Sequence, residues 1–477
     1  MSLFPDIVDY VILGLYCYVV LSVIGLILLE NRNPAKTLIW ILALTLLPVI
    51  GLVLYIFLGQ DFRRKKIISK KTIDRIGRKN ISKHLCTNID FKQVPQKVMK
   101  MVNLLSNNSE LPIYANNRIE IFTSGKDAFD AFFTDITRAT EHIHIEFYII
   151  ANDNAGTRLR DLLIKKVQEG VKVRVIYDYI GSFSLNKKFL QPLKEAGAYI
   201  QAFLPIHRQI GLSKINYRNH RKLIVIDGKV GYTGGMNIAN RYIVGNHLGI
   251  WRDTMVRFEG SAVHGLQNAF LTDWYFVESK LITDKKYYPT PRHFENNIVQ
   301  IVSSGPDTDW ENIMQGIVAM IHSAEKYIYI HTPYFLPTEP ILSALQIASL
   351  SGIDIRLMLP QRVDTKMIQL ATHSYLKHVL EAGIRVFFYQ NNFLHSKAIV
   401  SDDYVSTIGT ANIDFRSYEQ NFELNAFVYD KETAISLRKA FENDLKSCKE
   451  ITLEQWKKRK RKERLEDSLA RLFSPIM

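Results

Sequence analysis

Cysteine is scarce in this sequence. The 477 residues include only three cysteines, which lie far apart and never form a C-x-x-C pair. This excludes a disulfide framework and a zinc–thiolate site, and it is typical of a protein in a reducing compartment. Metal-binding motifs are missing as well, because the sequence contains neither H-E-x-x-H nor an EF-hand-like run of aspartates. The sequence therefore predicts no metal and no cofactor.

Charged residues are absent from two long apolar stretches near the N-terminus. These stretches run from Tyr10 to Leu29 and from Leu38 to Leu58, and each is close to the roughly 20 residues that span a bilayer as a helix. No basic residue precedes the first stretch and no small-residue cleavage site follows it, which argues against a cleaved signal. We therefore predict two transmembrane helices within residues 1–60.

Positive charge prevails in the chain as a whole, whose 477 residues have a formal net charge of +14 at pH 7. This favours an anionic partner, and the apolar stretches favour an anionic membrane surface over nucleic acid. Residues 61–110 are expected to form a basic linker, which by the positive-inside rule places the downstream chain in the cytoplasm; two spans would place the N-terminus there too. A second basic run, Lys457–Arg464, either contacts the membrane or forms a solvated helix face.

An internal repeat organises the chain beyond residue 110. In each half, three apolar stretches with strand-like composition follow one another in the same order, separated by helical patterns that end at glycine. The stretches are residues 141–150, 170–178 and 195–203, matched by 326–335, 352–360 and 381–389. This indicates an α/β fold of two pseudo-symmetric lobes with mixed sheets flanked by helices. We place the lobes at residues 111–302 and 303–477, with the boundary at a Gly-Pro-Asp turn.

Each lobe also carries one copy of a longer motif. The pattern is H-x-K, four residues, D, six residues and then G-[GT]-x-N, in "HRKLIVIDGKVGYTGGMN" and "HSKAIVSDDYVSTIGTAN". A lone H-x-K carries little information, but the full pattern at equivalent positions of a repeat is very unlike chance. Its members are His220, Lys222, Asp227 and Asn237 in the first copy, and His395, Lys397, Asp402 and Asn412 in the second.

This motif suits chemistry at a phosphodiester. Residues two apart on a strand face the same way, so each histidine shares a pocket with its lysine. The lysines, with Asn237 and Asn412, would bind non-bridging phosphate oxygens as negative charge develops. One histidine would attack phosphorus while the other protonates the leaving alkoxide. Downstream carboxylates, Asp253 in "WRDT" and Glu423 in "NFELN", either orient these imidazoles or are ordinary strand-end charges.

The doubled His/Lys/Asp motif resembles that of the phospholipase D superfamily, and the whole chain is similar to bacterial cardiolipin synthases. The similarity also rests on "NRNPAKTLIWIL", "SGPD", "TPYFLP" and "RLFSPIM". It implies two phospholipase D-like lobes, and a catalytic set of His220, Lys222, Asp227, His395, Lys397 and Asp402. It further implies a covalent phosphatidyl-histidine, which we expect on His220. One departure is Met255, where many relatives would have histidine.

The resemblance implies transfer of a phosphatidyl group from one phosphatidylglycerol to another, giving cardiolipin and glycerol. The chain has no D-G-x-x-A-R segment, which favours phosphatidylglycerol over CDP-diacylglycerol as donor. A membrane phospholipase D that uses water or other alcohols stays open as the alternative. A nuclease or an inactive lipid-binding organiser fits the spans and the intact motifs less well. We therefore expect a multi-pass protein of the bacterial inner membrane with cytoplasmic lobes, phosphatidylglycerol and cardiolipin as partners, no nucleic acid, and an oligomeric state left open.

Overall fold

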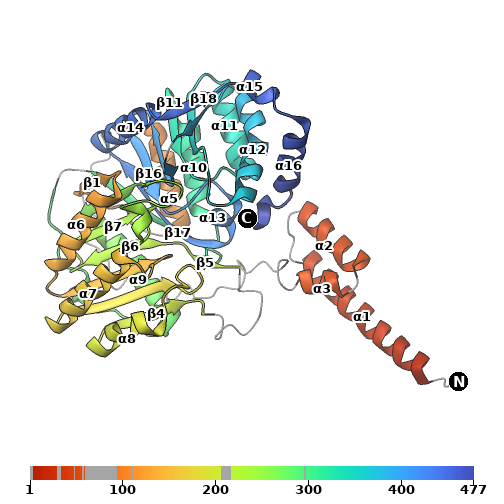
Figure 1. Ribbon diagram of the computed structural model, residues 1–477, viewed down its shortest axis with the longest axis horizontal. Coiled ribbons are helices and arrows are strands. Elements are labelled where there is room, and N and C mark those ends of the chain that lie inside the picture. The colour runs from red at the N-terminus through yellow and green to blue at the C-terminus, as the bar shows by residue number, and fades with distance from the viewer. Residues whose placement is uncertain are drawn as a thin grey trace. The chain divides into compact units, whose positions relative to one another are not determined.

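The computed structural model describes residues 4–29, 34–47, 49–55, 59, 94–109, 112–205, 216–294, 297–390 and 392–477. The chain divides into two compact units, which we describe separately (Figure 1). The smaller unit comprises Met1–Phe62 with Ile206–Asn216, and the larger comprises Arg63–Pro205 with Tyr217–Met477.

The first apolar stretch forms one long helix, α1 (Phe4–Leu29), of 26 residues. At a rise of 1.5 Å per residue this helix is about 39 Å long, which exceeds the hydrocarbon thickness of a bilayer. Within the described residues it contains the one helical segment that is long and apolar enough to cross a membrane, Val8–Leu29. The first predicted span is therefore present as a helix of sufficient length.

The second apolar stretch is broken into two helices, so the prediction of one uninterrupted helix from Leu38 to Leu58 is wrong. Helix α2 (Pro34–Leu46) ends and α3 (Ile50–Leu54) begins on either side of Pro48, and a proline ring clashes with the helix turn that precedes it. Helix α3 folds back on α2: the ring centroids of Trp40 and Tyr55 lie 5.4 Å apart. The last predicted residues, 56–58, lie outside the described residues.

The larger unit contains two mixed sheets of closely related topology (Figure 1). The order of the first sheet is β1-β9-β7-β6-β2-β3-β4. The second sheet has the order β10-β17-β16-β15-β11-β12-β13-β18, with β5 paired to β17. In both sheets the central strand pairs in parallel with the next strand along the chain and antiparallel with the strand that follows the H-x-K motif.

The strand bounds confirm the repeat. The first sheet consists of β1 (Arg118–Phe122), β2 (His142–Phe147), β3 (Lys172–Asp178), β4 (Tyr199–Phe203), β6 (Lys222–Ile226), β7 (Val230–Gly234) and β9 (Met255–Glu259). The second consists of β10 (Ile298–Ser304), β11 (Tyr327–His331), β12 (Asp354–Pro360), β13 (Arg385–Tyr389), β15 (Ala398–Ser401), β16 (Val405–Gly409), β17 (Asn421–Tyr429) and β18 (Cys448–Ile451). All six apolar stretches that define the repeat contain a strand.

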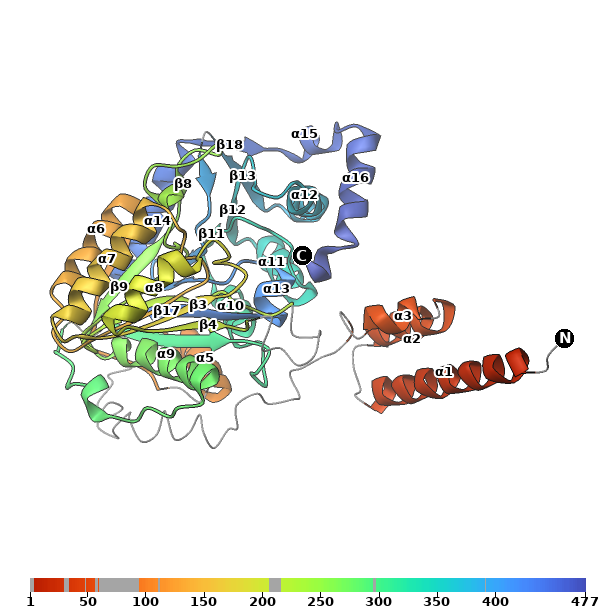
Figure 2. The same cartoon turned by 60° about the horizontal axis from the view of Figure 1, so that its bottom comes forward.

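Helices cover both faces of the sheets. In Figure 2, α6 (Gly125–Thr137), α7 (Asn154–Gln168) and α8 (Lys187–Ala196) lie on one side of the first sheet and α9 (Ala262–Glu278) on the other. The second lobe contributes α10 (Asn312–Ser323), α11 (Glu339–Leu350), α12 (Lys366–Glu381), α13 (Phe415–Glu419), α14 (Lys431–Leu445), α15 (Leu453–Lys457) and α16 (Arg461–Arg471). Short 3-10 turns are η5 (Asn240–Tyr242), η6 (Lys285–Tyr287) and η7 (Ser474–Ile476). The glycine expected to end α8 is Gly197, which has a φ of 104°.

The lobe boundaries differ from those expected. The boundary placed between residues 302 and 303 falls inside β10, which belongs to the second sheet. Helix α5 (Gln96–Ser109), expected in the linker, contributes Val98, Met101 and Leu105 to the apolar core of the second lobe. The rest of the expected linker, residues 61–93, lies outside the described residues.

Candidate active site

Two short strand pairs join the lobes, and each one positions a motif histidine. Strand β5 (Arg218–Asn219) of the first lobe pairs with the start of β17 in the second lobe, and the next residue, His220, donates its backbone N–H to the carbonyl of Phe422 over 2.9 Å. Strand β14 (Phe393–Leu394) of the second lobe pairs with β8 (Trp251–Arg252) of the first lobe. There His395 donates its backbone N–H to the Arg252 carbonyl over 2.8 Å.

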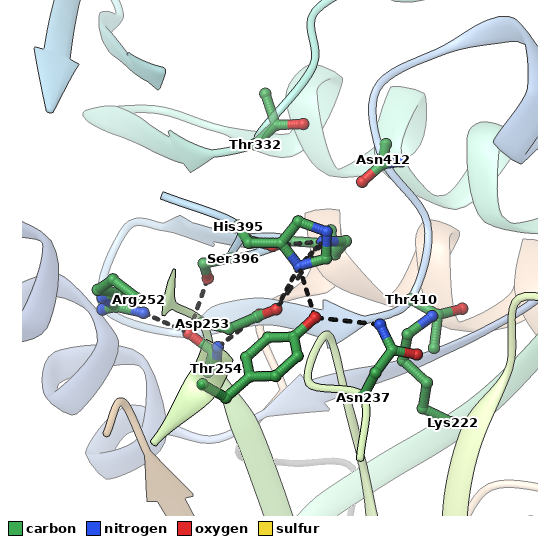
Figure 3. Close-up of polar contacts among 12 residues, drawn as sticks. Lys222, Asn237, Arg252, Asp253, Thr254, Thr332, His395, Ser396, Thr410 and Asn412 are labelled. Carbon is green, nitrogen blue, oxygen red and sulfur yellow. Dashed lines mark hydrogen bonds and ion pairs between the residues drawn. The ribbon is translucent and has the colours of Figure 1, made fainter. Parts of the chain in front are cut away.

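The exchanged strands give each histidine a carboxylate from the other lobe. Nδ1 of His220 lies 2.9 Å from both carboxylate oxygens of Glu423. Nδ1 of His395 lies 2.6 Å from Oδ2 of Asp253 (Figure 3). The structure therefore places both predicted carboxylates on the imidazoles, and it pairs them across the lobes. With Nδ1–H directed to a carboxylate, the lone pair on Nε2 of each ring is available for chemistry.

The two motif lysines lie on the same side as their histidines, as the i, i+2 spacing predicts. Nζ of Lys222 donates to the backbone carbonyl of His220 over 2.6 Å. Nζ of Lys397 donates to the carbonyl of His395 and lies 2.9 Å from Nδ1 of the same histidine. All four side chains are buried, so their charges act in a medium of low dielectric constant.

Burial and mutual repulsion set the protonation states of these groups. Burial, opposed by the charge of Glu423, lowers the pKa of His220 to about 4, and burial together with the lysine charges lowers the pKa of His395 well below its usual range. Burial lowers the pKa of Lys222 to about 7 and that of Lys397 to about 8, although nearby carboxylates oppose the effect. The site therefore holds neutral imidazoles beside weakly held ammonium charges.

The two carboxyl groups that bind the histidines differ in pKa. Burial raises the pKa of Asp253 to about 6, with Lys397 opposing it. Burial also acts to raise the pKa of Glu423, but the charge and hydrogen bond of His220 outweigh it and the pKa is lowered. Thr410 adds a hydroxyl donor to Glu423. The position equivalent to Thr410 is Gly235, where an added Cβ would lie 2.1 Å from Oδ1 of Asp253.

The structure places the carboxylates of the two motif aspartates away from the motif histidines. Asp227 follows the five residues of β6, an extended length of about 17 Å from the histidine end. Its carboxylate accepts the backbone N–H groups of Thr140, Glu141 and His142. Asp402 accepts the backbone N–H groups of residues 325–327 in the same way. Both aspartates therefore hold the beginning of an inner strand, β2 in the first sheet and β11 in the second.

The motif asparagines hold the protein's own groups. Oδ1 of Asn237 accepts the N–H of Ile149, and Nδ2 donates to the hydroxyl of Tyr242. Asn412 accepts no hydrogen bond at its buried Oδ1 among the described residues, and its backbone N–H donates to Ser417 over 3.1 Å. Phosphate binding by the two amides stays a prediction.

Aromatic residues that we did not predict complete the site. The hydroxyl of Tyr242 lies 3.4 Å from Nδ1 of His395, and the ring of Trp251 lies 4.9 Å from the His395 ring. The ring of Tyr148 contacts His220 edge-on at 5.0 Å. The sequence did offer a signal for two of them: Tyr242 and Trp251 lie between two predicted site residues, Asn237 and Asp253. The described residues contain no group of three or more His, Cys, Asp or Glu side chains arranged to hold a metal ion.

Comparison with known proteins agrees with this geometry. The family model described as "Cardiolipin synthase, PLD-like domain" matches residues 132–274 and 317–445, which include both motifs. The chain belongs to this family. A second model, "Phospholipase_D-nuclease N-terminal", matches residues 14–60.

Relatives in the cardiolipin synthase family match the chain over nearly its whole length. The major cardiolipin synthase ClsA of Bacillus subtilis is 40% identical over 96% of this chain and 97% of its own. A cardiolipin synthase of Listeria monocytogenes is 37% identical over 94% of this chain and 95% of its own. The crystal structure of phosphatidylserine synthase from Haemophilus influenzae shares the fold. It has a TM-score of 0.61 at 15% identity and covers 79% of this chain and all (100%) of its own.

Proposed function

We propose that this chain synthesises cardiolipin by moving a phosphatidyl group from one phosphatidylglycerol to a hydroxyl of a second, with release of glycerol. The observation that carries the proposal is the pair of buried histidines, each bound at Nδ1 by a carboxylate from the other lobe, beside two buried lysines. Cardiolipin synthases at about 40% identity over most of the chain support this choice of substrate. None of the relatives described above favours hydrolysis as the main reaction.

In the first half-reaction, Nε2 of His220 attacks the donor phosphorus. We assign this role to His220 because its carboxylate, Glu423, stays ionised against the ring with two oxygens at 2.9 Å. That charge stabilises the positive imidazole that forms when the N–P bond is made. The bond between phosphorus and the glycerol oxygen breaks, and His395 gives its proton to the departing oxygen. Lys222 and Lys397 neutralise the non-bridging oxygens.

In the second half-reaction, a hydroxyl of the acceptor phosphatidylglycerol attacks the same phosphorus. His395 now removes the hydroxyl proton, the new P–O bond forms, and the N–P bond to His220 breaks. Cardiolipin leaves and both imidazoles return to their starting states. Binding of an anionic phosphodiester also raises the pKa of His395, whose low value in the free site comes from burial and the lysine charges, so the acid can take up its proton when substrate arrives.

We further propose that the chain crosses the membrane once and that the lobes are cytoplasmic. Helix α3 folds back on α2, as the Trp40–Tyr55 contact shows, so this segment returns to the side that it enters. The first two turns of α1 contain Asp6 and Asp9 but neither Lys nor Arg, whereas the basic residues of the N-terminal region follow α1. The positive-inside rule then places the N-terminus outside and the lobes inside.

The C-terminal helix α16 provides a surface for anionic lipid. Leu465, Leu469, Leu472 and Phe473 are exposed, Leu472 by 74%. The first three recur at helical spacing along one face and follow the basic run Lys457–Arg464. An exposed apolar stripe beside basic residues is typical of helices that lie in the headgroup region. We propose that α16 lies on the anionic membrane surface.

The proposal is tested by reconstitution of the full-length protein in vesicles of phosphatidylglycerol, without CDP-diacylglycerol or added metal. We expect cardiolipin and glycerol in equal amounts by mass spectrometry. Phosphatidic acid in place of cardiolipin would instead establish hydrolysis. His220→Ala and His395→Ala should abolish the reaction, whereas His247→Ala, at an exposed histidine, is the matched control and should leave it unchanged.

A further inference from the structure

Arg241 is a half-buried cation beside the active site that lacks an ion-pair partner among the described residues. It lies in η5, directly before Tyr242, whose hydroxyl approaches Nδ1 of His395. Its Nε is buried and has no hydrogen-bond partner in the described part of the chain. An unpaired buried donor is costly to leave in place. This points to a partner that the protein itself does not supply.

Two other arginines near the motifs carry ion pairs, although Nε of Arg252 also lacks a hydrogen-bond partner among the described residues. Arg221 forms a buried ion pair with Asp273, and Arg252 pairs with Asp444 over 2.8 Å. These two guanidiniums thus have a structural explanation. Arg241 stacks instead on an aromatic ring, with Cζ 4.5 Å from the centre of the Trp251 ring. Stacking orients the guanidinium but leaves its N–H groups able to bind an anion.

The position of Arg241 places it on the His395 side of the site. The ring of Trp251 contacts the His395 ring at 4.9 Å, so the guanidinium and the imidazole contact the same indole. The charge of Arg241 is also among those that lower the pKa of His395, after burial and the two motif lysines. When His395 activates the hydroxyl of an acceptor alcohol, the other groups of that alcohol therefore lie near Arg241.

Further positive charge lies near the His220 side of the site. Burial raises the pKa of Tyr148, the residue packed on His220, and the charges of Arg218, Arg416 and Arg241 oppose this rise. Arg218 and Arg416 come from different lobes, and the charge of Arg416 contributes to the lowered pKa of Arg218, after burial and against the opposing charge of Asp178. The charge of Arg241 thus acts on both halves of the site, at Tyr148 beside His220 and at His395.

We propose that Arg241 binds the phosphate of the acceptor phosphatidylglycerol. This inference rests on the proposed function. The leaving glycerol and the incoming headgroup occupy the same place next to His395, but only the incoming lipid carries a phosphate of its own, three carbons from the reacting hydroxyl. The motif lysines are occupied by the phosphate under attack. A planar guanidinium can bind the second phosphate through two N–H groups, so Arg241 selects phosphatidylglycerol over glycerol or water as acceptor.

The test compares two acceptors on one enzyme. Full-length Arg241→Gln and wild type are assayed in mixed micelles for cardiolipin formation and for exchange of labelled glycerol into phosphatidylglycerol, which uses the same donor but an uncharged acceptor. We expect cardiolipin formation to fall about 10- to 100-fold, as for a lost hydrogen bond to a charged group, with glycerol exchange within twofold of wild type. Arg241→Lys should recover part of the loss. Arg158→Gln is the control, because Arg158 also stacks on a ring, Phe133 at 4.2 Å, but is exposed on α7.

The outcomes separate this inference from the proposed function. Equal loss of cardiolipin formation and glycerol exchange in Arg241→Gln would overturn the inference, because the residue would then serve the donor step or the fold. Unchanged cardiolipin formation would overturn it too. A wild-type comparison that needs no variant uses soluble acceptors: glycerol 3-phosphate should be used more efficiently than glycerol, and a preference for glycerol would contradict a phosphate subsite. Failure of the wild type to form any cardiolipin would refute the proposed function instead.

Discussion

Replacement of Asp227 by asparagine should lower stability and leave the chemistry intact. The Asp227 carboxylate accepts four hydrogen bonds, three from the backbone N–H groups of Thr140, Glu141 and His142 and one from the Thr140 hydroxyl, at 2.8–3.1 Å. Burial acts to raise its pKa, but these bonds outweigh burial and lower it. The charge is therefore part of what fastens the start of β2 to the end of β6.

The expected loss follows from the hydrogen bonds. Asparagine offers one carbonyl oxygen in place of two charged ones, so about half of the bonds are lost and the rest become neutral. At about 1.5–3 kcal/mol for each of four bonds to a charged group and about 1 kcal/mol for each of two remaining neutral bonds, we expect a destabilisation of about 4–10 kcal/mol. Asp227 has a φ of 54°, a conformation that asparagine also tolerates, so the substitution adds no backbone strain.

The assay measures stability and turnover separately. Thermal unfolding of the detergent-solubilised protein, followed by intrinsic fluorescence, should show a Tm lowered by about 4–10 °C, because the unfolding entropy of a chain of this size is about 1 kcal/mol/K. The turnover number per folded enzyme should stay within twofold of wild type. Asp402→Asn should behave alike, and Asp161→Asn, at an exposed surface aspartate on α7, should change neither quantity. An unchanged Tm with lost turnover would refute the reasoning and return Asp227 to the catalytic set.

Four further predictions concern the site and the membrane. The kcat/KM for phosphatidylglycerol should fall as pH rises through 7–8, because Lys222 and Lys397 lose their charge there. It should also fall as pH drops below about 4, because His220 becomes protonated. A flat profile between pH 7 and 9 would contradict the role of the lysines. Glu423→Gln should lower kcat about 100-fold or more with little change in KM, measured in mixed micelles, because the substitution removes the charge that stabilises the phosphorylated ring; an equal loss through KM alone would argue against it. Excess EDTA should leave turnover unchanged, and loss that Mg²⁺ restores would disprove a metal-free reaction. A cytoplasm-dependent reporter should be active when fused after Met477 and inactive when fused before residue 1, whereas activity in both fusions would restore two crossings.

The sequence predicted the lobe architecture well because its signals are local. The strand-forming stretches are short and apolar, four of the six contain a helix-ending glycine, and all six contain a strand in the structure. His220 and Lys222 point to the same side, as do His395 and Lys397, because side chains two residues apart on an extended chain share a face. These features depend only on residues close together in the sequence, so each could be predicted from the sequence of a single lobe.

The remaining features depend on contacts between distant residues. Nothing in the spacing showed that Glu423 would serve the histidine of the other lobe, because the pairing of β5 with β17 joins segments about 200 residues apart. The motif position of Asp227 suggested chemistry, whereas its distance from His220 becomes visible only when β6 is seen as an extended strand. The break in the second apolar stretch did have a local signal, Pro48, which the hydropathy alone concealed.

The exchange of β5 and β14 between the lobes has a consequence for how the two histidines came to differ. Two separate identical chains related by a twofold axis would carry the same carboxylate on both imidazoles, so neither ring could be tuned without the other. Joining both copies in one chain removes this constraint. Glu423 with Thr410 surrounds one histidine, and Asp253 with Tyr242 surrounds the other. A single polypeptide can thus adjust the attacking group and the proton carrier independently, by substitutions in whichever lobe lies opposite.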